Sequence, residues 1–226
     1  MSLIFTARQS RLTFWESGPV TLLSDAQRHL SSVDKVLAEI IPLVGECRVK
    51  LNNNAWEALF LAVVYQQLNG ALAKRIIDRI RGHLNGAIPS PQDLLSWPDN
   101  WLVQTGLNSR KKVTLLTVAD QIEKGKLDLG SFNSLSDDRV IEKLTSIWGI
   151  GTWTASMFLV FHLGRSDVII PGDLGIRKAI RFNYALSRFP TESEVEKISS
   201  AWSPFRTMGS WYLWKSLPGF PEPGLN

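Results

Sequence analysis

An aspartate at the start of a predicted helix is the side chain best suited to chemistry in this sequence. Asp173 follows an apolar run that ends in Pro171 and Gly172, and helical spacing begins after it. A fixed carboxylate can stabilise a developing positive charge and can orient or deprotonate an attacking water. Aspartate also suits a plain N-cap, and the two roles are compatible. Asp167, which precedes the apolar run, is expected at the surface.

A glycine hairpin ahead of this aspartate is a candidate phosphate contact. Gly149 and Gly151 permit a tight turn, and Ile150 between them can anchor it in a core. A helix is predicted to start at once with Thr152, so its free amides and positive dipole end would face outward beside little side-chain bulk. The alternative is an ordinary corner between two helices, because short glycine motifs are weak signals.

The elements that must position these residues are predicted to be helices. Apolar residues recur at spacings of three and four through most of the chain, and alternation of period two is scarce after the opening residues. The chain is therefore expected to be all-α. The opening 20 residues form either a short strand or an irregular arm. The expected helices span residues 25–44, 54–69, 71–85, 109–124, 137–146, 151–164, 173–186, 191–200 and 204–216.

Composition narrows the classes of function. The 226 residues carry a net charge of +4 and a pI near 9.3, which suits a protein that touches phosphates on one face. One cysteine, Cys47, and three dispersed histidines argue against a disulfide framework, a four-cysteine cluster or a metal-centred mechanism. No signal segment and no apolar run of about 18 residues is found, so we expect a soluble intracellular protein without membrane contact.

Four motifs in order resemble the helix-hairpin-helix GPD superfamily of DNA glycosylases. They are residues 62–68 (AVVYQQL), residues 107–111 (LNSRK), the hairpin 144–155 (LTSIWGIGTWTA) followed by 171–180 (PGDLGIRKAI), and residues 202–206 (WSPFR). The resemblance covers residues 55–216 and is most similar to the 3-methyladenine DNA glycosylase II branch. It implies that Asp173 is the catalytic carboxylate.

The resemblance also implies an architecture and partners. We expect one glycosylase domain over 1–226 with two helical lobes and the active-site cleft between them: a central lobe 57–164, which ends in the helix-hairpin-helix 144–164, and a second lobe from 1–56 and 165–226. Double-stranded DNA with damaged bases is the expected partner. We expect a monomer in the cytoplasm or nucleoid of a prokaryote or in the nucleus of a eukaryote. No cofactor is implied beyond a monovalent cation on hairpin backbone carbonyls.

One position within the hairpin helix selects the chemistry. Family members that also cleave the DNA backbone carry a lysine where this sequence has Trp153, and tryptophan cannot form a Schiff base. The chain is therefore expected to be a monofunctional enzyme that leaves an abasic site. The missing cysteine cluster agrees, because the endonuclease III and adenine-mismatch branches usually carry one.

Aromatic residues are the candidate pocket. Trp153 and Trp214 match tryptophans of the 3-methyladenine branch and could stack on a cationic alkylated purine, with core packing as the alternative. Met157 stands one helical turn after Trp153, where that branch often has tyrosine, and gives a soft apolar wall. Tyr65 is a further candidate for the base pocket.

A turn and several basic residues are candidates for DNA contacts. Gln66, Gln67, Leu68 and Asn69 end one helical pattern, and the wedge that fills the vacated base stack is expected at Gln67 or Leu68, with Asn69 close behind. A helix end with buried amides is the alternative. Phosphate contacts are expected from two basic turns, with ordinary solvated charge as their alternative: Arg110, Lys111 and Lys112, and Arg177, Lys178 and Arg181.

Two other functions remain open at this point. A non-catalytic helix-hairpin-helix module would bind DNA without needing Asp173, the turn at Gln67 or an aromatic pocket. A monofunctional glycosylase for deaminated or mismatched bases would share most motifs, and only the two tryptophans favour alkylated purines over that reading.

Overall fold

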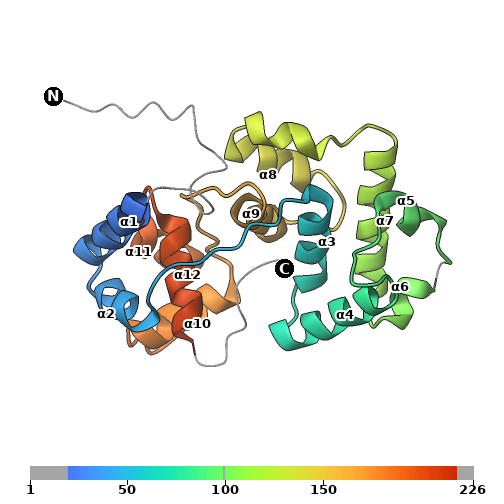
Figure 1. Ribbon diagram of the computed structural model, residues 1–226. Coiled ribbons are helices and arrows are strands. Elements are labelled where there is room, and N and C mark those ends of the chain that lie inside the picture. Colours follow the sequence, from blue (N-terminus) through green and yellow to red (C-terminus); the bar gives the residue numbers. More distant parts are fainter. Residues whose placement is uncertain (1–19, 99, 218–226) are drawn as a thin grey trace. The chain divides into compact units, whose positions relative to one another are not determined.

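The computed structural model describes residues 20–98 and 100–217, and every regular element in that part of the chain is a helix (Figure 1). This confirms the all-α prediction. The chain divides into two compact units: unit 1 holds the described residues up to Leu51 and from Leu163 to Leu217, and unit 2 holds those from Asn52 to His162. The predicted cleft between lobes stays a prediction, and the expected strand or arm in the opening residues lies outside the described residues.

Unit 1 is built around a buried C-terminal helix. α12 (Arg206–Ser216) is buried continuously from Thr207 to Trp214 and packs against α2 (Lys35–Val44) and α10 (Leu174–Asn183). A helix that is covered on all sides needs no amphipathic pattern. The remaining elements of unit 1 are α1 (Val20–Val33), α11 (Glu192–Ser199) and the 3-10 helix η2 (Ser200–Trp202).

The predicted single helix over 25–44 is wrong, because Asp34 divides it. Asp34 has extended backbone angles, and its Oδ1 accepts hydrogen bonds from the amides of Val36 and Leu37, so it caps α2. Its other oxygen, Oδ2, accepts from the Tyr184 hydroxyl and from the Trp202 indole N–H at 2.8 Å. These distant partners fix the break, and helical periodicity cannot reveal them.

Unit 2 has two apolar helices at its core. α3 (Ala55–Tyr65) starts at the cap Asn54 and is buried from Ala58 to Val64, and α9 (Thr152–Phe161) is buried from Thr154 to its end. These two helices pack against each other. Around them lie α4 (Gly70–Gly82), α5 (Pro91–Ser96), α6 (Trp101–Gln104), α7 (Ser109–Glu123), η1 (Leu129–Ser134) and α8 (Asp137–Thr145).

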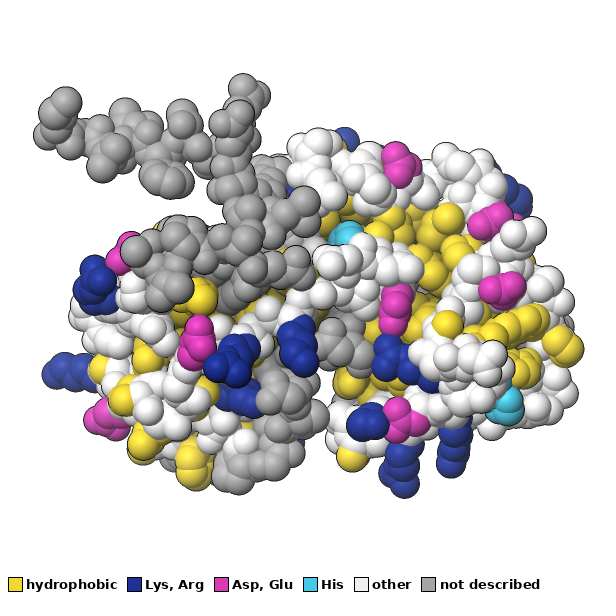
Figure 2. Space-filling model, viewed as in Figure 1, with side chains coloured by type: hydrophobic (Ala, Val, Ile, Leu, Met, Phe, Trp, Pro, Cys, Tyr) yellow, Lys and Arg dark blue, Asp and Glu magenta, His cyan; other side chains and the backbone are white. Residues whose placement is uncertain are grey.

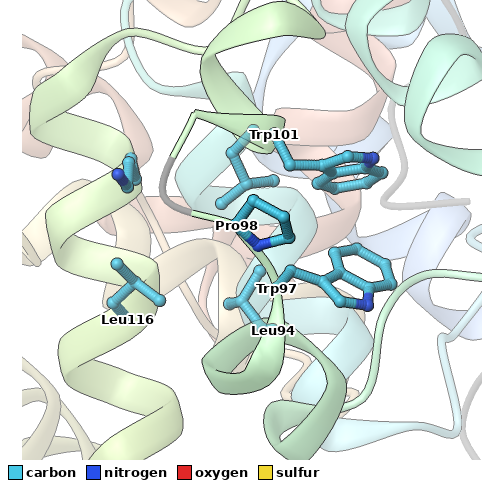
Figure 3. A pocket seen from close by; sticks show the side chains of 7 residues that line it. Leu94, Trp97, Pro98, Trp101 and Leu116 are labelled. Carbon is cyan, nitrogen blue, oxygen red and sulfur yellow. The ribbon is translucent and has the colours of Figure 1, made fainter.

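The short helices α5 and α6 were not predicted, because each is too short to show a periodic pattern. α5 begins with a capping box of Ser90 and Asp93. The Trp97 and Trp101 rings lie 4.1 Å apart between centroids, and with Leu94, Pro98 and Leu116 they line a small pocket (Figure 3). Apolar side chains also reach the surface of unit 2 over α6 (Figure 2). Of the residues predicted to contact DNA or the base, only Lys112 lines this pocket.

No helix between residues 20 and 217, residue 99 aside, is long and apolar enough to cross a membrane. No cluster of three or more histidine, cysteine, aspartate or glutamate side chains that could hold a metal ion occurs among the same residues.

Candidate functional site

The hairpin between α8 and α9 requires glycine at its first glycine position. Gly149 has φ of +84°, which side chains rarely adopt, and a Cβ placed there would lie 1.9 Å from the Thr114 hydroxyl oxygen. The hairpin backbone therefore lies directly against α7. Ile150 is buried, and its amide donates to the Ile147 carbonyl to close the turn. The predicted anchoring of the turn by Ile150 is confirmed.

The second glycine has a different role. A Cβ at Gly151 would meet nothing within 4 Å, so no packing inside the protein forbids a side chain there. Gly151 is the N-cap of α9 and supplies no side-chain hydrogen bond, whereas α8 and α10 are capped by Ser136 and Asp173. The N-terminus of α9 thus has no side-chain cap from its N-cap residue, and it lies next to open space and the exposed Thr152. Such a helix end is a site for an anion.

Gln66 braces this hairpin. Its amide nitrogen donates to the Gly149 carbonyl and to the Thr154 hydroxyl, both at 2.9 Å. Gln66 was predicted to contact DNA, but the structure assigns its amide N–H groups to the hairpin. The turn after α3 and the hairpin before α9 are therefore tied together by one side chain.

The turn after α3 presents one side chain on a strained backbone. Gln67 is exposed and has φ of +54°, a left-handed conformation that costs a non-glycine residue about 1 kcal/mol or more. Leu68 is half-buried, and the Asn69 side chain caps α4 by accepting from the Leu72 amide. Of the predicted wedge candidates, Gln67 and Leu68 keep side chains without such a capping role.

Lys111 stabilises the end of α3, directly before the same turn. It was predicted to contact a phosphate, but it is only 5% exposed, and its ammonium donates to the Val64 carbonyl at 2.8 Å, at the C-terminal end of α3. A cation is favourable at that end of a helix. Burial lowers the pKa of Lys111 to about 8. We correct the prediction: Lys111 holds the last turn of α3.

The predicted base-pocket residues of unit 2 lie on α3 and α9. Trp153 is half-buried in the first turn of α9, Met157 one turn later is buried, and Tyr65 at the end of α3 is half-buried. Burial raises the pKa of Tyr65.

The candidate catalytic carboxylate is fixed from two sides in unit 1. Asp173 caps α10, with Oδ1 accepting from the Ile176 amide at 2.8 Å. The same oxygen accepts from the indole N–H of Trp214 at 2.9 Å. Asp173 is 9% exposed and Trp214 is 2% exposed. Trp214 therefore holds the carboxylate, a role that the sequence did not suggest, and its predicted stacking on a base stays a prediction.

Asp167, the nearest acidic rival, has a structural role. Its oxygens accept from Nε and Nη2 of Arg206, at 2.8 and 3.0 Å, and from the Ser203 hydroxyl. Burial acts to raise its pKa, but these hydrogen bonds outweigh burial, and the pKa of Asp167 is lowered. Its carboxylate is committed to the segment that precedes α12.

The predicted phosphate-binding arginines lie over aromatic rings. Arg110 lies 5.6 Å from the ring centroid of Trp148, a 53%-exposed side chain that directly precedes Gly149. Arg177, on α10, lies 6.0 Å from the ring centroid of Phe189. Trp148 and Phe189 were missed by the sequence analysis. An exposed tryptophan beside the hairpin glycines was the available signal for the first, and Phe189 gave none.

The comparisons with known proteins agree with the predicted family. Residues 60–204 match the family described as HhH-GPD superfamily base excision DNA repair protein. DNA-3-methyladenine glycosylase 1 of Schizosaccharomyces pombe is 35% identical over 202 residues, which cover 87% of this chain and 89% of that protein. The chain belongs to the HhH-GPD superfamily of base excision DNA repair proteins.

Solved structures give the same result. A 3-methyladenine DNA glycosylase of Schizosaccharomyces pombe in complex with abasic DNA has a TM-score of 0.79 and 35% identity, covering 84% of this chain and 95% of that chain. A DNA-3-methyladenine glycosidase from Bacillus halodurans has a TM-score of 0.70 and 32% identity, covering 89% of this chain and 93% of that chain.

The buried ammonium of Lys111 predicts a pH dependence of stability. The folded chain loses this proton near pH 8, whereas an unfolded lysine holds it to about pH 10.4. Between these values the unfolded state binds more protons, so the contribution of Lys111 to the free energy of unfolding rises with pH. We would measure the free energy of unfolding in urea for wild type and Lys111→Met. The value for wild type minus the value for the variant should increase by on the order of 1 kcal/mol from pH 7 to pH 10. Lys178→Met, at an exposed lysine, is the control, and a flat or falling difference for Lys111 would contradict the assignment.

Proposed function

We propose that this protein is a monofunctional DNA glycosylase of base excision repair, which flips out alkylated purines of the 3-methyladenine type and hydrolyses their N-glycosidic bond. The observation that carries the proposal is the Asp173 carboxylate, held at the start of α10 by the Ile176 amide and the Trp214 indole. The relatives named as 3-methyladenine glycosylases support the choice of lesion.

The chemistry follows from the charge of the substrate. When the bond between the sugar and the base breaks, its electron pair leaves with the base and positive charge builds on the deoxyribose. Asp173 stabilises that charge, orients the water that adds to the sugar carbon and accepts the proton that this water loses. An alkylated purine is already cationic, so the departing electron pair neutralises it and no general acid is required. The products are the free base and an abasic site.

Trp214 is a positioning residue in this scheme. Its indole N–H donates to the same oxygen of Asp173 that accepts from the Ile176 amide. These two hydrogen bonds hold that oxygen in place, and they therefore orient the whole carboxyl group. Fixed orientation is what lets one carboxylate act without reorganisation when charge develops.

Two features of unit 2 complete the proposal. Trp153 offers an aromatic face to a cationic base and, in place of a lysine, cannot form a covalent Schiff base with the sugar. Gln67 is the wedge that enters the vacated stack, because it is exposed on a turn that Gln66 and Lys111 hold in place. The amide of Thr152 at the start of α9 binds a backbone phosphate.

The backbone carbonyl oxygens of the hairpin are proposed to bind the monovalent cation that the family resemblance implies. Ile147 and Gly149 each accept one hydrogen bond through their carbonyl oxygens, and a carbonyl oxygen has a second lone pair, so the donor set fits such an ion. DNA affinity compared in potassium and tetramethylammonium chloride at equal ionic strength tests this part. The protein is proposed to act as a monomer on double-stranded DNA, in the cytoplasm or nucleoid of a prokaryote or the nucleus of a eukaryote.

Asp173→Asn is the direct test of the proposed activity. Asparagine keeps an oxygen that can cap α10 but removes the negative charge, so single-turnover excision of 3-methyladenine and 7-methylguanine should fall by about 100-fold or more. Affinity for the same duplex should stay within about twofold.

Trp214→Phe, which removes the indole N–H and keeps a ring, should cause a smaller loss of excision rate than Asp173→Asn. Any strand break should require alkali, and borohydride should trap no covalent adduct.

Asp167→Asn is the matched control for this test. It should lower stability through the lost pairing with Arg206 while excision persists. If both aspartate variants lose excision equally, or if Asp173→Asn retains a near-normal rate, Asp173 is not the catalytic group. Release of uracil or hypoxanthine in preference to methylated purines by wild type would overturn the lesion class.

Trp153→Leu tests how the base is recognised. Leucine keeps an apolar wall but removes the aromatic face, so excision of cationic 3-methyladenine should fall by about 1 to 2 kcal/mol in activation free energy, or roughly five- to thirtyfold. Excision of neutral hypoxanthine should fall less. Single-turnover rates are needed, because slow product release can hide the chemical step. Equal losses on both bases would mean that Trp153 acts through shape.

Gln67→Gly tests the wedge. Glycine accepts a positive φ without strain, so the free energy of unfolding should not fall, while excision from duplex DNA should fall by about tenfold or more because unstacking is no longer compensated. Excision of the same lesion in single-stranded DNA should be nearly unchanged. Ala185→Gly, at another non-glycine residue with positive φ, is the control and should leave excision intact. A loss of equal size on both substrates would remove the wedge assignment.

A further inference from the structure

Two arginines on α10 share one aromatic ring. The guanidinium carbons of Arg177 and Arg181 lie 6.0 and 5.1 Å from the ring centroid of Phe189, which is half-buried in the segment between α10 and α11. Nε of Arg177 also donates to the Pro190 carbonyl at 2.8 Å. The segment after α10 thus gathers two positive charges at one place on the surface of unit 1.

This arrangement has an electrostatic cost unless an anion is present. Like charges four residues apart destabilise a helix by a few tenths of a kcal/mol. Among the described residues no carboxylate pairs with Arg177 or Arg181, whereas Arg28, Arg188 and Arg206 each have one. A cation–π contact uses the face of the guanidinium and leaves the N–H donors in its plane for an acceptor. Planar donors of this kind suit phosphate oxygens.

The position of the pair on α10 points to the phosphates of DNA. Asp173, Arg177 and Arg181 are spaced by four residues and so form one stripe, with the arginines about 6 and 12 Å along the axis from the aspartate. Phosphates of one strand follow each other at about 3.4 Å of axial rise. Arginines at these positions lie within a few nucleotides of a sugar that Asp173 contacts.

We propose that Arg177 and Arg181, held by the ring of Phe189, bind backbone phosphates of the damaged strand beside the nucleotide that Asp173 acts on. The proposal rests on the proposed glycosylase function, which brings a DNA strand to Asp173. Phe189 is a positioning residue in it, because the ring sets where the two guanidinium groups lie and touches no substrate.

Unit 2 contains the same construction beside the hairpin. Arg110 lies over the exposed ring of Trp148, next to the uncapped start of α9. It too has no carboxylate partner among the described residues. An arginine on an aromatic ring therefore occurs in each unit close to the residues proposed to contact DNA, which favours a common ligand of phosphate type.

The salt dependence of DNA binding tests this site. We would measure the affinity of the full-length protein for a duplex with an uncleavable abasic analogue by fluorescence anisotropy, over a series of potassium chloride concentrations. Arg181→Gln and Arg177→Gln should each reduce the slope of log affinity against log salt by about 0.9 and the affinity at 0.1 M salt by about eightfold. Arg28→Gln removes the same charge from an ion-paired arginine in the same unit and should change the affinity less than twofold.

Variants of Phe189 separate positioning from folding. Phe189→Leu should weaken binding by about two- to fivefold, the range of an exposed cation–π contact, while the melting temperature stays near that of wild type. Phe189→Trp restores a ring and should restore the affinity. If both α10 arginine variants match Arg28→Gln, the phosphate site is wrong. If Phe189→Leu binds like wild type, the role of the ring is wrong.

The outcome is distinguishable from failure of the proposed function, because the binding assay needs no excision. A wild-type protein that releases no alkylated base yet shows the arginine-dependent slopes would overturn the glycosylase proposal and keep the phosphate site. A protein that excises 3-methyladenine but shows unchanged slopes would overturn the phosphate site alone.

Discussion

One oxygen of Asp173 accepts two hydrogen bonds, and these two bonds position two helices of unit 1. Oδ1 accepts the Ile176 amide and so starts α10, and it accepts the Trp214 indole and so ties α10 to α12. The helix that follows the carboxylate carries Arg177 and Arg181, so the same start point sets where both lie. α12 is buried on every side, which makes its indole a rigid donor. A substitution that moves α12 within the core therefore acts on the carboxylate without touching it.

The two glycines of the hairpin, Gly149 and Gly151, have different surroundings. Gly149 is fixed by the Thr114 side chain of α7, and Gly151 faces space that a side chain could occupy. The first glycine is thus required by packing inside the protein, and the second is proposed to leave room for a DNA phosphate. The sequence alone does not distinguish the two glycines, because no local pattern shows which glycine packs against another helix and which faces open space. A side chain at the first should damage folding, and one at the second should damage binding.

Much of the fold, and the place of Asp173 at the start of a helix, could be predicted because they depend on local patterns. Helical periodicity, caps such as Asn54 and the order of motifs around Asp173 are all readable along the chain. The interpretation failed where a side chain has distant partners. Asp34 breaks a helix because of Tyr184 and Trp202, and Lys111 is directed inward by the Val64 carbonyl. A lysine in a basic run gives no sign of which cation is buried, since only the packing of α7 against α3 decides it.

The brace formed by Gln66 has a consequence for how the protein searches DNA. Its hydrogen bonds to Gly149 and Thr154 order the turn after α3 before any duplex arrives. A disordered turn would lose conformational entropy at each base pair it inspects, and that loss would recur at every undamaged site along the way. An ordered turn avoids that repeated loss, so residence at each normal base pair can be short. Under the proposed wedge role of Gln67, the rate of one-dimensional scanning should then be limited by the unstacking of the base rather than by the folding of the turn.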